Sequence, residues 1–345
     1  MDLKKFTYEL PESLIAAYPS RDRQAARLLV VRRSTGELTH SVFSELGNFL
    51  DPGDLLVLND TKVFPARLRG AKESGGKVEV LLLECFSEKR SLWIALVDSA
   101  KRPQVGSRIV FGDGMIAQVI GDMGRGRFGL EFHHPGEFSK HLQTVGEPPL
   151  PPYITRSREA ATLDWERYQT VYAANPGAIA APTAGFHFTP ELFDKLQARG
   201  IEKAPLTLHV GPGTFQPVRE QQVENHRMEG ERYALTAETA EKIHRAKQSG
   251  CRVVAVGSTS TRTLEWIARQ KGKVEADEGI ARLFIRPGDP FCVIDALITN
   301  FHLPGSTPLI LVAAFAGLEL VRRAYAEAIK LQYRFYSYGD AMLIL

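Results

Sequence analysis

Residues 251–262 read Cys-Arg-Val-Val-Ala-Val-Gly-Ser-Thr-Ser-Thr-Arg, an apolar run followed at once by small polar residues. The apolar run is typical of a buried strand, and the residues after Gly257 open a predicted helix that continues to about Gln270. Another predicted helix, from about Ala237 to Ser249, precedes this strand. A helix, a strand and a helix in this order favour a mostly parallel sheet covered by helices.

The same rhythm extends in both directions from this stretch. A helix is predicted from Thr189, with Pro190 at its first position, to Gly200, because Thr is a good N-cap and Pro fits the first helical turn. The apolar run at 55–58 is typical of a buried strand and predicts that the first sixty residues join the α/β body. The other expected elements are an apolar run at 179–181, strands at 206–210, near 283–285 and at 293–298, and a long helix at about 308–330.

Between these elements lies a segment of a different character. Short alternating runs bounded by Gly, Asp or Ser predict six strands that close into a small antiparallel β-barrel, because closure removes exposed sheet edges. The fold class expected is therefore α/β, with the barrel inserted into the body. The expected division is 1–62 and 153–345 for the body and 63–152 for the barrel. The six runs are 66–69, 77–82, 91–96, 108–111, 115–120 and 127–132.

Composition excludes several classes of protein. The 345 residues include 43 Lys and Arg against 40 Asp and Glu, a net charge of +3, and 44% are apolar, which excludes a disordered chain and a polycation. The three cysteines are widely spaced, so neither a disulfide framework nor a zinc motif is expected. The N-terminus resembles no signal peptide, and the longest apolar run, 309–318, is too short to span a membrane. A cytoplasmic protein is expected.

Four polar, Gly-containing loops follow predicted strands. Ligands of open α/β sheets bind beyond the carboxyl ends of the strands, so these loops predict a small-molecule site. The loops are Pro-Thr-Ala-Gly-Phe-His-Phe-Thr at 182–189, Gly-Pro-Gly-Thr-Phe at 211–215, Gly-Ser-Thr-Ser-Thr-Arg at 257–262 and Thr-Asn-Phe-His-Leu-Pro-Gly-Ser-Thr at 299–307.

Each loop alone leaves alternatives open. The 211–213 triplet is either a ligand loop or a tight turn, and Gln216 replaces the third glycine of a dinucleotide fingerprint. The 257–262 loop either binds an anion at a helix N-terminus or is a well-capped helix start. The histidines of these loops lack the spacing of zinc ligands, so no metal is expected, and hydrogen bonding or acid–base chemistry is favoured.

Basic residues gather at 21–33 and at 62–77. Such runs are usually solvated faces, and phosphate contact is the alternative.

Five longer motifs are specific enough to identify a family. The chain resembles the S-adenosylmethionine:tRNA ribosyltransferase-isomerases of queuosine biosynthesis, collinearly from Leu10 to the C-terminus. The motifs are Asn-Asp-Thr-Lys-Val-Phe-Pro-Ala-Arg-Leu at 59–68, Ala-Pro-Thr-Ala-Gly-Phe-His-Phe-Thr at 181–189, Leu-Thr-Leu-His-Val-Gly-Pro-Gly-Thr-Phe at 206–215, Thr-Asn-Phe-His-Leu-Pro at 299–304, and Tyr-Arg-Phe at 333–335 with Gly-Asp-Ala-Met at 339–342.

The resemblance implies an unusual reaction. The ribosyl group of S-adenosylmethionine, rather than its methyl group, moves onto 7-aminomethyl-7-deazaguanine at the wobble position of the tRNA anticodon and is rearranged to give epoxyqueuosine. Adenine and methionine leave. S-adenosylmethionine is then a substrate, and no metal, other cofactor or obligate protein partner is expected. The chain departs from the family pattern at Glu229, where a second His is usual, so no role is carried to that position; it departs also at Phe186, Ser258, Trp266 and 289–290.

The reaction needs a base for the carbon beside the sulfonium and an acid for the departing adenine. Histidine titrates near pH 7, and carboxylates can face the sulfonium. Candidate catalytic residues are His187, His209, His226, His302, Asp60, Glu231 and Asp340. We hypothesise that His187 lies against the ribose and takes part in proton transfer.

Binding residues are predicted from the same motifs and from the polar loop at 257–262. The candidates for S-adenosylmethionine are Thr183, Ala184, Gly185, Gly211, Gly213, Thr214, Phe215, Ser258, Thr259, Arg262 and Asn300, and those for tRNA are Lys62, Arg67 and Arg334. Two other function classes stay open. One is a conventional S-adenosylmethionine-dependent tRNA methyltransferase, which lacks support because no Gly-rich loop follows the first strand. The other is a non-catalytic tRNA-binding protein, which would leave the four loops unexplained.

Overall fold

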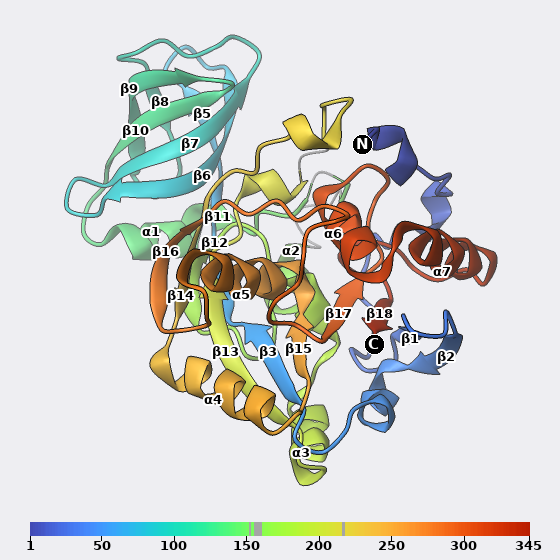
Figure 1. Cartoon of the computed structure of the whole chain (residues 1–345). Helices are drawn as coiled ribbons and strands as arrows, with labels where there is room; N and C mark the ends of the chain where they lie inside the picture. Colours follow the sequence, from blue (N-terminus) through green and yellow to red (C-terminus); the bar gives the residue numbers. More distant parts are fainter. Residues whose placement is uncertain (152, 155–160, 216–217) are drawn as a thin grey trace.

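The computed structural model of the chain describes residues 1–151, 153–154, 161–215 and 218–345; the side chains of 161–163 and 214–215 are outside this description. Strands in the described part form a nine-stranded sheet, a seven-stranded sheet and a two-stranded pair. The seven-stranded sheet lies at the upper left of Figure 1, and the nine-stranded sheet runs through the larger body beneath it.

The nine-stranded sheet is mixed. Its centre is parallel, with β13, β3, β15 and β17 side by side, and antiparallel pairings join β14, β16, β18 and β2 to it. β1 and β18 pair in parallel. Across the sheet the order is β16 (Asp277–Ala281), β14 (Glu231–Leu235), β13 (Glu202–Leu208), β3 (Leu55–Asn59), β15 (Val253–Val256), β17 (Ala296–Asn300), β18 (Ala341–Ile344), β1 (Arg27–Val31) and β2 (Leu38–Val42).

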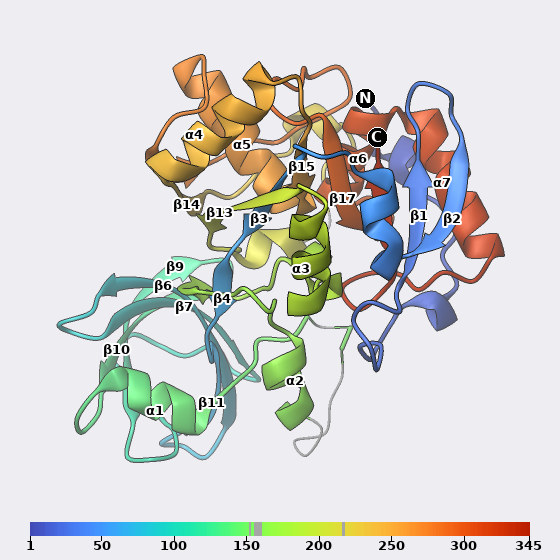
Figure 2. The same ribbon diagram turned by 90° about the horizontal axis from the view of Figure 1, so that it is seen from below.

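Both faces of this sheet are buried, because successive residues of a strand point to opposite sides. Val253 and Ala255 pack into one hydrophobic cluster, and Val254 and Val256 pack into the other. The first cluster is covered by α4 (Ala237–Gln248), α5 (Gly257–Lys271), α6 (Thr307–Ala316) and α7 (Leu318–Lys330), and the second by α3 (Pro190–Ala198) and the 3-10 helix η3 (Phe43–Phe49). Figure 2 shows α3 on the side of the sheet away from α4 and α5.

The smaller sheet is a closed barrel. Six antiparallel strands follow one another around it, and β5 pairs with β8 to close the ring. Gly70 lies at this seam, where a Cβ would come 2.6 Å from the Val110 carbonyl oxygen, so the two strands meet only because the residue is glycine. The strands are β5 (Arg67–Lys72), β6 (Lys77–Ser87), β7 (Leu92–Ser99), β10 (Arg127–His133), β9 (Ile116–Gly124) and β8 (Arg108–Val110), with the short β11 (Gly146–Glu147) added beside β5.

The remaining elements connect the two sheets. β4 (Thr61–Val63) continues from β3 toward the barrel and pairs with β12 (Asn175–Ala178). The others are α1 (Phe138–Val145), α2 (Ala161–Arg167) and the 3-10 helices η1 (Leu3–Phe6), η2 (Glu12–Leu14), η4 (Thr183–His187), η5 (Pro212–Phe215) and η6 (Val223–Asn225).

The expected fold class, an α/β body with an inserted six-stranded barrel, is confirmed, and the body sheet is more mixed than the strand–helix rhythm indicated. The predicted long helix at 308–330 is instead two helices, because Gly317 adopts a positive φ of 88° that glycine tolerates and that ends α6. The strand expected near 283–285 is absent from the described residues there, and β16 at 277–281 forms the edge strand instead. The domain limits stay a prediction, and one of them, residue 152, lies outside the described residues.

Candidate functional site

The carboxyl ends of four neighbouring parallel strands meet at one edge of the body sheet. The strand order β13, β3, β15, β17 places the residues that follow these strands along this edge. Asp60 follows β3, His209 follows β13, and Ser258 follows β15 within the first turn of α5, while Asn300 ends β17. We call this line of residues the carboxyl edge. Three of the four loops expected to carry chemistry therefore follow strands that end here.

His209 and Asp60 form one corner of this edge. The His209 Nδ1 atom lies 2.8 Å from the Thr61 hydroxyl, and Asp60 accepts hydrogen bonds from the Thr207 hydroxyl at 2.6 Å and the Asn175 amide at 3.0 Å. Burial, with a smaller influence from the Arg232 cation, lowers the pKa of His209, and Asp60 opposes this. The imidazole is therefore neutral at pH 7 and able to accept a proton.

Gly177 holds the His209 ring in place from behind. A Cβ on Gly177 would lie 2.8 Å from the ring, so only a glycine lets this backbone approach so closely. The ring is thus fixed between the Gly177 backbone and Thr61.

A buried ion pair joins β14 to α5 beside this corner. The Arg262 guanidinium bonds the Glu231 carboxylate, and both side chains are less than a tenth exposed. Glu231 Oε1 also accepts a hydrogen bond from the Gly211 backbone N–H at 3.0 Å, which ties the 211–213 loop to the pair. Burial lowers the pKa of Arg262 to about 10, so the side chain remains a cation at pH 7.

The first turn of α5 has no side-chain cap, because Val256 occupies its N-cap position. The hydroxyls of Ser260, Thr261 and Thr263 bond the carbonyls four residues earlier and are unavailable to the helix start. Thr259 Oγ1 is buried and has no hydrogen-bond partner within the described chain. Of the two alternatives for 257–262, this geometry favours an anion-binding helix start over a self-capped one.

The 182–189 loop folds as η4 and is packed tightly against the sheet. Thr183 is half-buried, Ala184 is buried, and a Cβ on Gly257 would lie 3.6 Å from that of Ala184. A Cβ on Gly185 would lie 2.0 Å from the Tyr172 hydroxyl oxygen, so this motif glycine is required by the packing. Because β12 ends at Ala178, this loop does not directly follow a strand of the main sheet, but η4 contacts β17.

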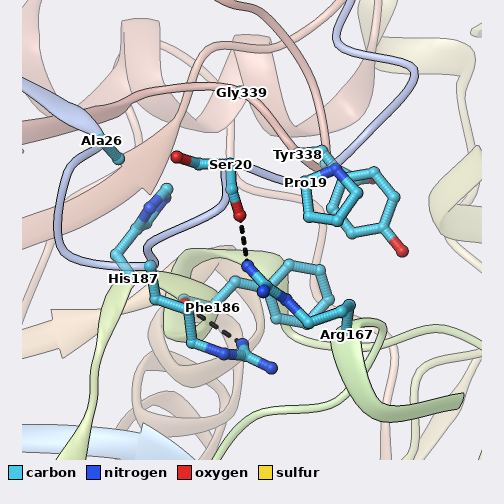
Figure 3. Close-up of a pocket in the computed structure, with 10 residues that line it drawn as sticks. Pro19, Ser20, Ala26, Arg167, Phe186, His187, Tyr338 and Gly339 are labelled. Atoms are coloured by element: carbon cyan, nitrogen blue, oxygen red, sulfur yellow. Dashed lines mark hydrogen bonds between the residues drawn. The ribbon is translucent and has the colours of Figure 1, made fainter. Parts of the chain in front are cut away.

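His187 ends η4 and is 4% exposed. Its ring packs on Phe43 at 4.9 Å, and burial lowers its pKa to about 4, with a smaller opposing influence from the Asn300 side chain. His187 Nε2 and Asn300 Oδ1 are buried atoms without a hydrogen-bond partner in the described part of the chain. Figure 3 shows the His187 ring pointing toward Ala26. Both residues line a small hollow with a volume of about 20 Å³.

The arginines around this hollow donate hydrogen bonds to backbone carbonyls, so they do not form an open site for an anion. Arg23 donates to the Phe186 carbonyl at 3.1 Å, and Arg167 bonds the Ser20 carbonyl (Figure 3). Arg27 bonds Asp340, and Arg33 lies over the Phe315 ring at 4.0 Å. Much of the basic cluster at 21–33 is therefore used within the fold.

Three predicted catalytic residues lie in structural networks. Asp340 is buried and accepts hydrogen bonds from the backbone N–H groups of Arg27 and Arg334, at 3.0 and 2.8 Å. His302 Nε2 lies 2.7 Å from the Thr299 hydroxyl, and burial lowers the His302 pKa to about 3. The His226 ring packs edge-on against Phe284, and burial lowers its pKa as well.

A large cleft opens beside the carboxyl edge, between the body and the barrel. Its volume is about 1640 Å³, and its body wall includes His209, Gly211 and Glu231. The opposite wall belongs to the barrel and α1. It carries the cationic side chains Lys89, Arg90 and Arg127, the carboxylates Glu84, Glu88, Glu131 and Glu137, the histidines 133 and 134, and the aromatic side chains Phe64, Trp93, Phe132 and Phe138. We call this the barrel wall. The Arg127 guanidinium bonds Glu229, so an ion pair bridges the two walls.

The barrel wall is not among the sites that the sequence predicts. The aromatic rings form a chain in which Trp93 lies 5.7 Å from both Phe64 and Phe138. Lys89 and Arg90 stand exposed in the turn between β6 and β7. The only available signal was the Lys-Arg pair in a predicted hairpin turn, and nothing in the pattern showed that this turn faces the body.

The residues predicted to contact tRNA differ in whether their side chains already have partners within the fold. Lys62 is exposed on β4. Arg67 bonds the Leu150 carbonyl at 2.7 Å and Glu79 at 3.2 Å, and Arg334 bonds the Tyr18 carbonyl. Of the other binding candidates, Gly213 lies beside Glu229, and the side chains of Thr214 and Phe215 lie outside the described residues.

Neither a metal cluster nor a membrane-spanning helix is found among the described residues. No group of three His, Cys, Asp or Glu side chains there could hold a metal ion. None of the helices described is both long and apolar enough to cross a membrane.

Comparison with known proteins gives consistent matches over the whole chain. The family model described as "Queuosine biosynthesis protein" matches residues 3–344. The chain is 51% identical over 344 residues to the S-adenosylmethionine:tRNA ribosyltransferase-isomerase of Pelobacter propionicus and 50% identical over 344 residues to that of Geobacter metallireducens, with all of each chain covered. It is also similar to the crystal structure of the S-adenosylmethionine tRNA ribosyltransferase of Thermotoga maritima, at 38% identity and a TM-score of 0.56, over 99% of this chain and 100% of that one.

Proposed function

The chain belongs to the queuosine biosynthesis protein family, and we propose on that premise that it is an S-adenosylmethionine:tRNA ribosyltransferase-isomerase. It transfers the ribosyl group of S-adenosylmethionine onto 7-aminomethyl-7-deazaguanine at the anticodon wobble position of tRNA and isomerises it. The products are epoxyqueuosine-tRNA, adenine and methionine. The names of the relatives support the reaction, and the cleft supports a site for two substrates of different size.

One observation carries this proposal: a single cleft has two chemically different walls. The body wall offers a neutral histidine, a carboxylate and backbone N–H groups. Groups of this kind can take a proton from the carbon beside the sulfonium and can donate one to the departing adenine. The barrel wall offers cations and aromatic rings, which bind phosphates and stack on unpaired bases. A loop of tRNA on the barrel wall would place its target base against the body wall.

Two histidines are proposed for proton transfer. His209 lines the cleft beside Asp60, and burial keeps its imidazole neutral. His187 is also neutral, but it lines a separate small hollow rather than the cleft, so its place against the ribose stays a prediction from the sequence motif. Asp340 and His302 are proposed as positioning residues, because their side chains bond neighbouring elements.

The proposal also covers the domain limits, the cellular compartment and the partners of the enzyme. The body comprises 1–62 and 153–345, and the barrel comprises 63–152. The enzyme works in the cytoplasm with tRNA and S-adenosylmethionine as its partners, and it needs no metal, further cofactor or obligate protein partner.

The experiment is to incubate the purified chain with S-adenosylmethionine and tRNA carrying 7-aminomethyl-7-deazaguanine. Release of adenine and methionine in equal amounts, with a new tRNA nucleoside, supports ribosyl transfer. S-adenosylhomocysteine as the product would indicate a methyltransferase. Tight tRNA binding with no turnover would indicate a non-catalytic binding protein.

A further inference from the structure

A second hollow lies beside the carboxyl edge, between the first turns of two helices. Ser258 and Arg262 line it from α5, and Thr307 and Leu311 line it from α6, the helix that begins at Thr307. Apolar side chains from other segments, Met228 and Phe284, complete the lining. The hollow therefore combines a few polar groups with a lining that is otherwise apolar.

Arg262 is the residue that marks this hollow as a ligand site. One guanidinium nitrogen, Nη2, bonds Glu231, while the other, Nη1, is buried and has no hydrogen-bond partner in the described structure. The whole side chain is only 6% exposed. A buried cation that retains unused donors is costly unless a further acceptor reaches it. Since Glu231 already serves Nη2, the acceptor for Nη1 is expected from a ligand.

Two helix starts strengthen the preference for an anion. The N-terminus of α5 has no side-chain cap, and Thr259 Oγ1 within its first turn is a second buried polar atom for which the described residues offer no partner. The first residue of α6 lines the same hollow. The α6 start is capped by Ser306, whose side chain accepts a hydrogen bond from the Leu309 N–H, so it contributes its helix dipole, whereas the α5 start offers uncapped backbone N–H groups as well; both favour negative charge.

Met228 lines both the hollow and the large cleft, so the two spaces are neighbours that this side chain separates or joins as it moves. The free space in the hollow is about 10 Å³, close to that of a single water, so a larger group enters when side chains shift. Met228 is unbranched and flexible, which suits such a movement. A molecule bound in the cleft can therefore extend one short, charged arm past Met228.

We propose that this hollow binds the α-carboxylate of the methionyl part of S-adenosylmethionine, with Arg262 Nη1, the α5 N-terminus and Ser258 as its donors. The inference rests on the proposed function and identifies which end of the substrate is anchored here. The apolar lining of Met228, Phe284 and Leu311 suits the methylene chain that leads from the carboxylate to the sulfonium. The ribose is then left toward the cleft, where the tRNA base must reach it.

A carboxylate fits this hollow better than a tRNA phosphate. A phosphate carries two ester links, and both would have to pass an apolar lining that leaves room for one small group. The carboxylate ends a flexible chain and needs only one opening.

The test compares two substrates that differ only in this carboxylate. S-adenosylmethionine and its decarboxylated analogue, which retains the sulfonium, the amine and the ribose, are each supplied with the precursor tRNA. A charge-assisted hydrogen bond predicts that wild-type kcat/KM is on the order of 10- to 100-fold higher for S-adenosylmethionine. In Arg262→Met this preference should shrink to within about threefold, because the variant no longer distinguishes the two.

Arg252→Lys is the matched control. Arg252 also bonds a buried carboxylate, Asp54, but at the opposite end of β15. Its substitution should lower stability and leave the substrate preference unchanged. If Arg262→Met does not fold because Glu231 is left unpaired, Glu231→Gln combined with Arg262→Met removes both charges, and Ser258→Ala probes the hollow without touching the pair.

Each outcome bears on a different claim. Equal wild-type rates with the two substrates, or an equal loss of both in the Arg262 variants, would overturn the assignment of this hollow. A raised KM for tRNA with an unchanged substrate preference would assign the hollow to a phosphate instead. Failure of the wild-type protein to release adenine from S-adenosylmethionine would overturn the proposed function itself.

Discussion

The surroundings of the carboxyl edge and the barrel wall are built in opposite ways. Near the carboxyl edge, His187, Thr259 and Arg262 lie outside the cleft lining, are each less than a tenth exposed, and each retain a polar atom without a hydrogen-bond partner in the described chain. On the barrel wall, Lys89 and Arg90 are solvent-exposed beside half-buried aromatic rings. Buried, unsatisfied groups suit a small molecule whose charges they complete, while exposed cations suit a large polyanion.

The largest effect is expected at His209. His209→Asn keeps a hydrogen-bonding group beside Thr61 but removes the titratable ring, and general acid–base catalysis contributes about 100- to 10,000-fold. We expect kcat to fall by this amount while the KM for tRNA changes little. Steady-state kinetics with purified variant protein measures both, with His244→Asn on α4 as the matched control. Near-normal kcat in His209→Asn would remove this residue from the chemistry.

The buried His187 predicts a pH-dependent loss of stability. Its pKa is about 4 in the folded protein and 6.5 when unfolded, so the unfolded chain binds the proton more tightly. Stability associated with this residue is therefore complete above pH 6.5 and is lost as the pH falls toward 4, by about 3 kcal/mol.

His187→Gln should remove this dependence. Urea unfolding between pH 4 and pH 7 measures it, with the Lys89→Ala protein as a control that retains the wild-type slope. A slope in His187→Gln equal to that of wild type would show that the imidazole is not desolvated in the fold.

The packing of η4 predicts a loss of stability from a single methyl group. Gly185→Ala places a Cβ 2.0 Å from the Tyr172 hydroxyl oxygen and 2.7 Å from Thr170 Cγ2. Overpacking of this kind costs about 1–3 kcal/mol. Tyr172→Phe removes the nearest atom and should restore part of the loss, so a double-mutant cycle by thermal unfolding isolates the clash. Additive effects of the two substitutions would contradict this contact.

The sequence predicts the two walls to different extents, because local patterns define one of them and tertiary packing defines the other. The strand ends and their Gly-containing loops are local patterns, so they predict that His209, Ser258 and Asn300 lie along one edge of the sheet, where the structure has them. Alternation likewise predicts the barrel strands. It does not show which outward side chains of the barrel face the body, because Arg90 and Trp93 meet the cleft only through tertiary packing.

Tertiary packing also revealed the uses of several charged residues. Arg27 and Arg67 belong to basic runs, yet the structure engages both with nearby carboxylates, Asp340 and Glu79. A charge run shows that cations are present but not which carboxylates will neutralise them. The break at Gly317 was similarly hidden, since a single glycine is tolerated in many helices and ends this one through its φ of 88°.

The barrel wall predicts an effect on tRNA binding that depends on salt. Removing Lys89 and Arg90 together should lower the slope of log affinity against log salt by about one to two, because Lys89 is exposed while Arg90 also pairs with Glu131 at 3.0 Å, and should raise the KM for tRNA several-fold. Filter binding over a range of salt concentrations measures the slope. Lys247→Ala, an ion-paired cation on α4, serves as the control. An unchanged slope would move the RNA contact elsewhere.

The smallest effect is expected for Lys62 and Arg67, which the sequence predicts equally to contact tRNA. Lys62→Ala should lower the salt slope by about one, because this side chain is exposed, whereas Arg67→Ala should leave the slope nearly unchanged. Arg67→Ala should instead lower the stability of the barrel by about 1 kcal/mol, through the lost bond to the Leu150 carbonyl. A lower salt slope in Arg67→Ala with unchanged stability, and an unchanged slope in Lys62→Ala, would show that Arg67 leaves Glu79 to contact RNA.

The division of labour between the two walls is tested most directly by single-turnover rates at saturating tRNA. We expect the combined Lys89→Ala and Arg90→Ala protein to recover a rate within about twofold of wild type once tRNA saturates, because its cations serve binding alone. His209→Asn should remain at least about 100-fold slower under the same conditions. A barrel variant that stays as slow as His209→Asn, or a His209→Asn protein rescued by tRNA, would contradict the separation of chemistry from RNA binding.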